Sequence, residues 1–545
     1  MSLSSDDTPT GPIASAPAPQ PAPAGSGPRP DSTRRRDIVV DLTAGVLLVL
    51  ALFFPWNLYF GFRIPDSNPN LLALLLAVTL LSLASLAIAL FGPRLNPALV
   101  GRLRLGLNVP YLLLVLGFVV FDAIQTIRSG GTVNVPGGVG PGGWLGITGA
   151  LLSAQPMLVS AATDEDGRGR WLRAAQILGY ASMFGAALST GFNLSWRVKY
   201  ALQPAAGASG FGKQNLAVID TAVVYGVVAL VAVVVASRWL LRATEAHRLS
   251  TVALGASTLA AGIIVWSLPI GREIDAFHGI AQNTSTAGVG YEGYLAWAAA
   301  AAIFAPLTLF RSPTTPPIDK AVWRAAARNG LLLIAVWCVG SVAMRLTDLL
   351  VAVMLNYPFS RYDSMTLAAF DLAAAVLAIW IRVNLATETL PGRLISALCG
   401  FLFMLTVSRV IVGIVLAPRF QASPGASPNP VYGNNLAQQI TSIFDVVLCG
   451  LALGILAAAI VIGRRRRPPQ RPRHPRRPRR PGRIGAPAAA PVPSAAQTTR
   501  ITAAGTADSH TTVLSRPAGS PRIFRSAEPT QQVRPKIYRP PDDSS

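Results

Sequence analysis

Long, uninterrupted blocks of apolar residues dominate the middle of this chain. Residues 71–91 read LLALLLAVTLLSLASLAIALF, and residues 217–237 read AVIDTAVVYGVVALVAVVVAS. Neither block has the alternation of a strand or the 3.6-residue period of a half-exposed helix. About 20 apolar residues in a helix span the roughly 30 Å hydrocarbon core of a bilayer. The pattern therefore predicts an all-α, polytopic transmembrane helix bundle.

Twelve blocks of this kind predict about twelve spans, arranged as helical hairpins. Their predicted bounds are 38–55, 71–91, 109–127, 144–162, 174–192, 217–237, 251–270, 294–310, 330–352, 364–385, 394–416 and 438–462. Residues 37–463 then form a transmembrane domain between two tails. Only 13% of the residues are charged, about half of what a soluble protein carries, and this agrees with the membrane assignment.

The basic residues predict the orientation of the bundle. With the N-terminus inside, the short inner loops hold 14 basic residues and the outer loops hold 8. Because cytoplasmic loops carry the excess of Lys and Arg, we expect a plasma-membrane protein with both termini in the cytoplasm. The chain has 43 arginines against 4 lysines, which indicates a bacterial genome of high G+C content.

The two predicted tails have different compositions. Residues 1–36 are rich in Pro, Ala and Ser, which predicts a disordered cytoplasmic segment. Residues 464–545 form a second disordered cytoplasmic tail, and its first twenty residues read RRRRPPQRPRHPRRPRRPGR. The alternating prolines favour an extended polyproline II conformation.

The arginines of the second tail are a candidate binding segment. An arginine near an anionic membrane surface contributes about 1 kcal/mol, so anionic lipid headgroups are the expected partner. A protein partner is an alternative, nucleic acid is not expected, and a plain topology anchor is the simplest interpretation. The candidate residues are Arg464, Arg465, Arg466, Arg467, Arg471, Arg473, Arg476, Arg477, Arg479 and Arg480.

Ionisable side chains interrupt the last predicted spans. At 1.5 Å per residue, four of them lie about 10 Å beneath the predicted outer boundary. A further acid is shallower, and another lies one turn from an arginine of the same span. The candidate intramembrane charge layer consists of Arg345, Asp348, Asp371, Arg409, Asp445 and Asp220.

This charge layer has two interpretations. A charge at the centre of a bilayer costs about 2.5–3.5 kcal/mol on insertion scales, so Arg409 should meet Asp445 or Asp371 across a helix interface. The layer is then either a substrate or ion site, or a set of ion pairs that joins neighbouring helices. A site predicts a water-accessible cavity that reaches Asp371 or Asp445, whereas a structural role predicts paired and dry groups.

No motif in the sequence predicts a cofactor or a metal site. The segment GREIDAFHG (271–279) places Glu273 and Asp275 near His278, but this is no recognised ligand spacing. The three cysteines fall in different apolar blocks and are expected to pack as small hydrophobes. No P-loop sequence is present, so the chain carries no ATPase motor of that type.

Three functions remain open. The first is a carrier of a small solute or a lipid-like molecule, supported by the number of spans and the charge layer. The second is a non-transporting scaffold of the cell envelope whose basic tail binds anionic lipid or a partner. The third, and least expected, is an envelope enzyme acting at the outer face. Its candidate carboxylates are Asp66, Glu273, Asp275 and Glu292.

Overall fold

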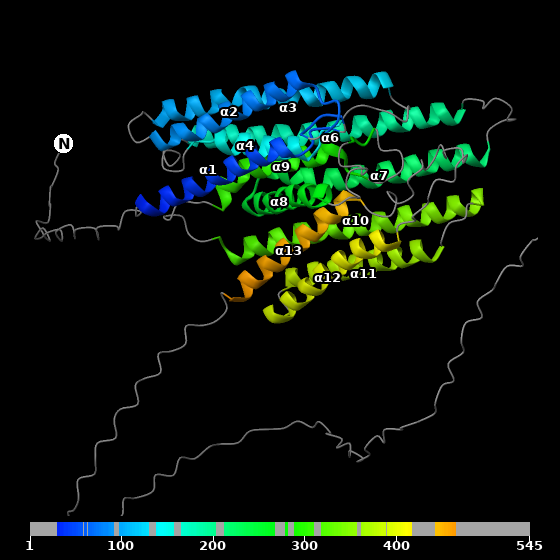
Figure 1. Ribbon diagram of the computed structural model, residues 1–545. Coiled ribbons are helices and arrows are strands. Elements are labelled where there is room, and N and C mark those ends of the chain that lie inside the picture. Colours follow the sequence, from blue (N-terminus) through cyan, green and yellow to red (C-terminus); the bar gives the residue numbers. More distant parts are fainter. Residues whose placement is uncertain are drawn as a thin grey trace, which may run out of the picture. The chain divides into compact units, whose positions relative to one another are not determined.

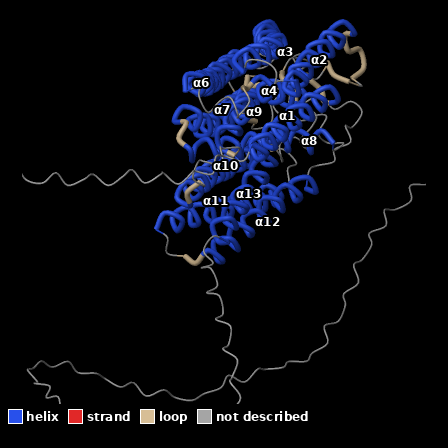
Figure 2. Tube along the Cα trace, turned by 90° about the vertical axis from the view of Figure 1, so that its left-hand side faces the viewer, coloured by secondary structure: helices blue, strands red, loops and turns tan. Residues whose placement is uncertain are grey.

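A computed structural model provides the fold of the chain. It describes residues 30–57, 59–62, 64–91, 97–129, 138–156, 165–202, 212–267, 278–281, 288–309, 318–356, 361–387, 390–416 and 442–464. In these residues the regular elements are α-helices, with no strand (Figures 1 and 2). The all-α prediction is confirmed, and a described helix overlaps each of the twelve predicted spans.

The first four helices form a unit around α4. They are α1 (Pro30–Phe53), α2 (Pro69–Phe91), α3 (Pro97–Ser129) and α4 (Pro141–Ala154). Helix α4 packs against α1 and α3, and α3 also packs against α2. Pro141 occupies the first turn of α4, where a missing N–H costs no helical hydrogen bond.

The next four helices form a second unit around α9. They are α6 (Glu165–Leu202), α7 (Lys213–Arg242), α8 (Glu245–Ser267) and α9 (Gly290–Thr308). Helix α6 packs along α7, and α9 packs against α6 and α8. The 38 residues of α6 rise about 57 Å, so this helix is much longer than the predicted span 174–192.

The last four helices form a third unit. They are α10 (Lys320–Leu355), α11 (Arg361–Thr387), α12 (Gly392–Leu416) and α13 (Ile443–Arg464). Helix α10 packs along α11 and α13, and α12 packs along α11 and α13. Contacts between units are made by α4 with α9, α7 with α10 and α8 with α13.

The first two units share a sequence pattern at an interval of 150 residues, and a similar tripeptide recurs in all three units. The third helix of each unit carries a similar tripeptide in its first turns: GRL at 101–103, HRL at 247–249 and GRL at 392–394. The fourth helices of the first two units align without gaps, as GVGPGGWLGITGALLSAQP (138–156) and GVGYEGYLAWAAAAAIFAP (288–306). The fourth helices of the first two units therefore share one sequence pattern.

Aromatic residues at intervals of 150 positions join the fourth helices at the core. Trp144, Tyr294 and Phe444 are fully buried. The rings of Trp144 and Tyr294 lie 4.8 Å apart, and those of Tyr294 and Phe444 lie 6.4 Å apart. Equivalent positions of α4, α9 and α13 thus contact one another in the middle of the bundle.

Among the described helices, eight are long and apolar enough to cross a membrane: α2, α3, α7, α8, α10, α11, α12 and α13. This makes the chain a multi-pass membrane protein by the length and composition of its helices. Helices α4 and α9 differ from the eight, because most of their side chains are buried in protein. With 14 residues, α4 is about 21 Å long.

Several predicted boundaries were wrong. The segment 144–162 was expected to be one span, but α4 ends at Ala154, just before Pro156. Residues 1–36 were expected to be disordered, but α1 already begins at Pro30. Arg104 falls outside the predicted span 109–127, yet it lies within α3 and is only 2% exposed. Its Nη2 pairs with Asp41 Oδ1 of α1 at 2.5 Å, which accounts for its burial.

Candidate functional site

The predicted charge layer contains a three-residue ion-pair cluster between α11, α12 and α13. Arg409 Nε lies 2.7 Å from Asp371 Oδ1, and Arg409 Nη1 pairs with Asp445 Oδ2. All three residues are at most 6% exposed. The ion pairs expected for Arg409 are thus present, and they join three consecutive helices.

Neighbouring donors complete this cluster. Ser341 Oγ donates to Asp371 Oδ2 at 2.6 Å, and Trp337 Nε1 donates to Asp445 Oδ1 at 2.7 Å. Both donors lie on α10, so the cluster connects all four helices of the third unit. A buried charge becomes tolerable when its lone pairs are satisfied in this way.

The space beside the cluster is too small to be a ligand site. Its volume is about 10 Å³, and it is lined in part by Asp371, Arg409 and Asp445. A single water needs about that much room. The cluster is paired and leaves room for about one water at most, which is the arrangement expected of a structural role.

The other members of the predicted layer lie between α10 and α7. Arg345 Nη1 is 3.9 Å from Asp348 Oδ2, and Tyr225 of α7 donates to the other oxygen of Asp348. Asp220 is only partly buried on α7, and the ion pairs around Arg409 do not include it. The predicted layer is therefore two local clusters plus a separate aspartate.

A large cavity with polar groups lies elsewhere, between α3 and α6. It has a volume of about 840 Å³, and residues of α4 and α9 complete its lining. Ligand sites commonly have volumes of about 300–1,000 Å³. The lining residues of α3 recur at helical spacing from Leu112 to Ile127, a length of about 22 Å along the axis. We call this cavity the α3/α6 cleft.

Asp122 is one of two acids in the α3/α6 cleft. It lies on α3, about two turns before that helix ends, and is 2% exposed. Tyr291 donates its hydroxyl hydrogen to Asp122 Oδ2 at 2.6 Å. The backbone N–H of Gly138 donates to Oδ1. Asp122 is therefore held by donors from α9 and from the segment that precedes α4.

Glu292 is the second acid, in the first turn of α9. Ser189 Oγ of α6 donates to Glu292 Oε1 at 2.6 Å, and the backbone N–H of Ile280 lies 3.2 Å from the same oxygen. A Cβ at Gly279 would come within 2.6 Å of Oε1, so the backbone there must stay close to the carboxylate. Glu292 links α6 to the loop before α9.

The polarity of the α3/α6 cleft changes along its length. Towards one end the lining contains Leu112, Val115, Ile147 and Leu178, which are all apolar. Towards the other end it contains the two acids together with hydroxyl groups. These are Thr126, Ser182, Ser189, Ser195 and Tyr291. The cleft is thus amphipathic from end to end.

The rim of the α3/α6 cleft is apolar. Leu116 and Ile127 of α3 are 55% and 72% exposed, and Leu188 of α6 is 58% exposed. All three line the cleft. Helix α3 has the composition of a membrane span, and exposed leucine and isoleucine in such a helix face lipid. The cleft therefore opens through a surface of this kind.

The sequence alone already pointed to both acids. Asp122 is an ionisable residue within the predicted span 109–127, as the members of the charge layer are within theirs, but it was not included in that layer. Glu292 was considered only as a candidate for an enzyme. The alignment of 138–156 with 288–306 adds a signal, because Glu292 falls where the first unit has Gly142.

The remaining sequence candidates are less informative. Glu273, Asp275 and the tail arginines after Arg464 lie outside the described residues, and Arg464 is the last residue of α13. Asp66 lies on an exposed turn.

Desolvation lowers the pKa of His278, in the loop before α9, to about 4, so its ring is neutral at pH 7. No group of three metal-ligand side chains occurs in the described part of the chain.

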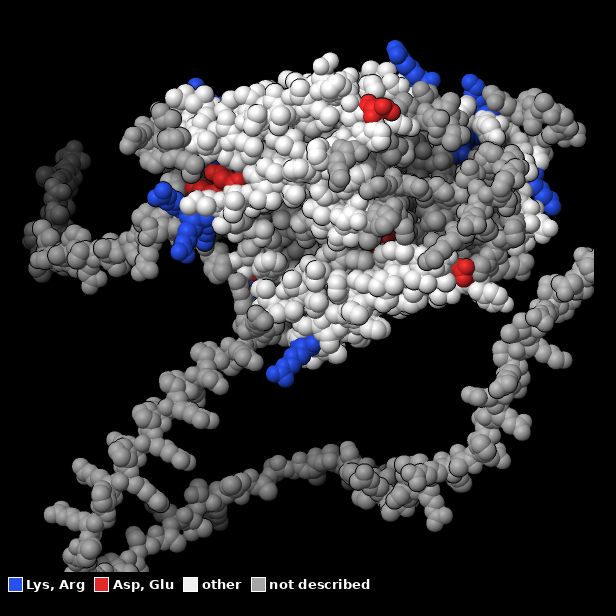
Figure 3. Space-filling view, viewed as in Figure 1, with Lys and Arg blue, Asp and Glu red and all other residues white. Residues whose placement is uncertain are grey.

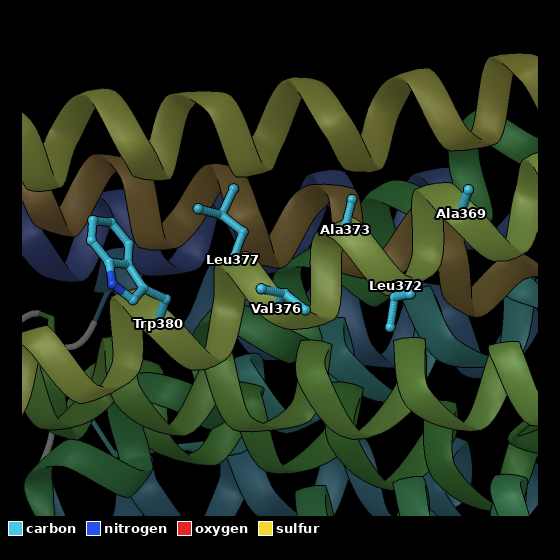
Figure 4. A pocket seen from close by; sticks show the side chains of 6 residues that line it. All are labelled: Ala369, Leu372, Ala373, Val376, Leu377 and Trp380. Atoms are coloured by element: carbon cyan, nitrogen blue, oxygen red, sulfur yellow. The ribbon is translucent and has the colours of Figure 1, made fainter.

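A second groove, on α11, is apolar throughout. Its side chains follow one stripe of the helix (Figure 4): Ala369, Leu372, Ala373, Val376, Leu377 and Trp380. Lipid tails would cover such a stripe without a specific ligand.

On the face seen in Figure 3, charged side chains lie mainly near the ends of the helices, with a broad uncharged surface between them.

Comparison with known proteins places the chain in one family. Residues 37–464 match a family described as a domain of unknown function, DUF7937. The match covers well over half of the chain, so the protein belongs to this family. No curated protein and no solved structure matches the chain. The matched region contains all the residues of the α3/α6 cleft and of the Arg409 cluster.

Proposed function

We propose that this protein is a carrier of a lipid-like molecule, which it binds in the α3/α6 cleft. The observation that carries the proposal is the apolar rim of a cleft whose far end holds two carboxylates. A water-soluble solute has no reason to enter through exposed leucine and isoleucine. An amphiphile enters laterally from the bilayer, with its chain along the apolar lining and its headgroup near Asp122 and Glu292.

The proposal includes a membrane topology. The twelve helices cross the plasma membrane in alternate directions, with both termini in the cytoplasm, as the distribution of basic residues favours. The acids of the cleft then lie near the outer face, because α3 ends there. The arginine-rich tail binds anionic headgroups of the cytoplasmic leaflet.

Filling the α3/α6 cleft with a large side chain tests the proposed carrier function. Gly185 of α6 lines the cleft, and a Cβ there would lie 3.8 Å from Glu292 Cγ. Gly185→Trp therefore keeps the backbone unstrained and fills the cleft. Gly117 of α3 is exposed, with no atom within 4 Å of a Cβ. Gly117→Trp is the matched control because it adds the same ring to the exposed face of α3.

The measurement is the transfer of a fluorescent single-chain lipid between leaflets of proteoliposomes. We expect the native protein and Gly117→Trp to transfer the lipid faster than protein-free vesicles do. The acceleration by Gly185→Trp should be at least tenfold smaller. Equal rates for all three proteins and the empty vesicles would contradict the proposal.

The scaffold is the second candidate, and the Arg409 cluster favours it. The described residues of that cluster pair with one another and leave little space for a ligand, which supports a structural role for the third unit. A scaffold would use this rigid unit to hold the basic tail at the membrane. It predicts that deleting residues 465–545 abolishes complementation of a deletion strain, while Gly185→Trp complements fully.

A further inference from the structure

Basic side chains form a stripe in the first turns of α10. Lys320, Arg324 and Arg328 follow one another at intervals of four residues, so they lie on one face of the helix. They precede the predicted span of this helix, which begins at residue 330. Like charges at this spacing repel one another, and Arg324 makes an interaction of its own. The stripe concentrates positive charge where α10 leaves the apolar region.

A further arginine, Arg382 of α11, meets the end of this stripe. Its Nη1 donates to the backbone carbonyl of Arg328 at 2.9 Å. The two positive charges are close enough to repel each other, and both side chains are partly exposed. The packing of α10 along α11 therefore holds two like charges together at one end of the bundle.

The described carboxylates do not neutralise this pair. Among the ion pairs between described residues, none includes Arg328 or Arg382. Along the two helices, the nearest described acids are Asp319, nine residues from Arg328, and Asp371, eleven residues from Arg382. These separations are about 14 Å and 17 Å. Glu245, where α8 begins, has a partner other than these two arginines.

The free donors of the arginine pair fit a phosphate group. A guanidinium group carries five N–H donors in a planar fork. Arg382 gives one of them to the carbonyl of Arg328, and no described acceptor bonds to the guanidinium group of Arg328, whose Nε is buried. Phosphate oxygens bind such forks in pairs. A phosphate between the two side chains would also remove their repulsion.

The depth of the arginine pair indicates a lipid phosphate. Helices α10 and α11 both have the composition of membrane spans, and the pair lies within about 5 Å of their predicted inner ends, residues 330 and 385. Ile379 and Leu372, on the same side of α11 as Arg382, are 47% and 55% exposed. A lipid whose headgroup lies at the pair therefore meets an apolar surface with its chain.

We propose that Arg328 and Arg382 bind the phosphate of an anionic phospholipid, in the leaflet that the proposed topology makes cytoplasmic. A zwitterionic phospholipid also carries a phosphate, but the arginines repel its ammonium group, so the site selects an anionic headgroup. This inference does not use the α3/α6 cleft, and it adds a lipid site to the third unit.

Native mass spectrometry of the full-length protein tests this site. The protein is released from micelles that contain equal amounts of phosphatidylglycerol and phosphatidylcholine, and the retained lipids are counted. We expect the native protein to retain phosphatidylglycerol at least tenfold over phosphatidylcholine. Arg328→Gln and Arg382→Gln should each reduce this preference at least threefold. Arg382→Lys keeps the charge without the fork and should restore only part of the preference, and it keeps the test valid if a glutamine variant does not fold.

The matched control is Arg393→Gln, which removes an exposed arginine from the start of the neighbouring α12. It should keep the preference within twofold, and so should Gly185→Trp, which fills the α3/α6 cleft. An equal loss in Arg393→Gln and Arg382→Gln would show diffuse attraction to a basic surface and overturn the proposal. A full preference in both glutamine variants of the pair would also overturn it. Displacement of phosphatidylglycerol by equimolar inorganic phosphate would overturn the assignment to a lipid.

Discussion

Tyr291 of α9 donates its hydroxyl hydrogen to Asp122 of α3 across 2.6 Å, and so joins two of the three four-helix units. The residue after this tyrosine is Glu292, which is bound by Ser189 of α6. The first turn of α9 therefore fixes both carboxylates of the α3/α6 cleft. The same turn thus contributes both to the packing of the core and to the proposed binding site.

Tyr291→Phe should weaken both the fold and the cleft. The variant leaves a buried carboxylate with one donor fewer, which costs about 1–3 kcal/mol. We expect a lower midpoint of thermal unfolding in detergent and weaker binding of the fluorescent single-chain lipid. Tyr362→Phe is the control, because Tyr362 is 82% exposed, and it should change neither quantity. An unchanged midpoint in Tyr291→Phe would argue against this hydrogen bond.

The Arg409 cluster should behave as one structural unit. Breaking a buried ion pair costs about 3–5 kcal/mol because the partner charge stays buried. Arg409→Gln and Asp371→Asn should each lower the free energy of unfolding strongly, and the double variant should cost less than the sum of the two. Unfolding in mixed detergent and SDS micelles measures all three values.

The matched control for this cluster is Arg393→Gln, since Arg393 is an exposed arginine of the same helix. It should stay within about 0.5 kcal/mol of the native protein. Additive losses, or an unfolding free energy for Arg409→Gln equal to that of the control, would show that the cluster does not hold the third unit together.

A pair of arginines two residues apart on α3 offers a second comparison. Arg104 is buried, its Nε donates to the Ser153 carbonyl of α4 at 2.7 Å, and it pairs with Asp41. Arg102 is exposed. Arg104→Gln should cost about 3–5 kcal/mol of unfolding free energy, whereas Arg102→Gln should cost less than about 0.5 kcal/mol. Similar values for the two variants would contradict the burial of Arg104.

Two glycines should respond to alanine with opposite signs. At Gly255 of α8, a Cβ would clash with Ala301 Cβ and lie 2.6 Å from the Trp297 carbonyl oxygen. Overpacking of this kind costs about 1–3 kcal/mol. At Gly106 of α3 nothing lies within 4 Å, so alanine should stabilise that helix by about 0.5–1 kcal/mol. Calorimetric unfolding of both variants checks the signs, and a stabilised Gly255→Ala would contradict the close approach of α8 and α9.

Much of the fold could be predicted from the apolar blocks. Each of the twelve predicted segments overlaps a helix. The cost of an unpaired buried charge also predicted that Arg409 pairs with Asp371 or Asp445, and it pairs with both. The hydrophobic pattern could not show that α4 and α9 lie at the core. A helix that is apolar on every face gives the same signal whether it meets lipid or protein.

The site was harder to predict because it depends on which helices become neighbours. Asp122 and Glu292 are 170 positions apart, and they come together because α9 packs against α6 and contacts α3 through Tyr291. The pairing of Arg409 was accessible because its partners lie on adjacent helices. A cavity is a space between side chains, and no residue pattern states its size.

Photolabelling tests the binding cleft most directly. A neutral single-chain lipid carrying a diazirine at the end of its chain is irradiated with the protein in nanodiscs, and the adducts are mapped by mass spectrometry. We predict adducts on Leu112, Val115, Leu178 or Leu295 that disappear with excess unlabelled compound and in Gly185→Trp. Adducts confined to the apolar stripe of α11, or insensitive to competition, would contradict the α3/α6 cleft as the binding site.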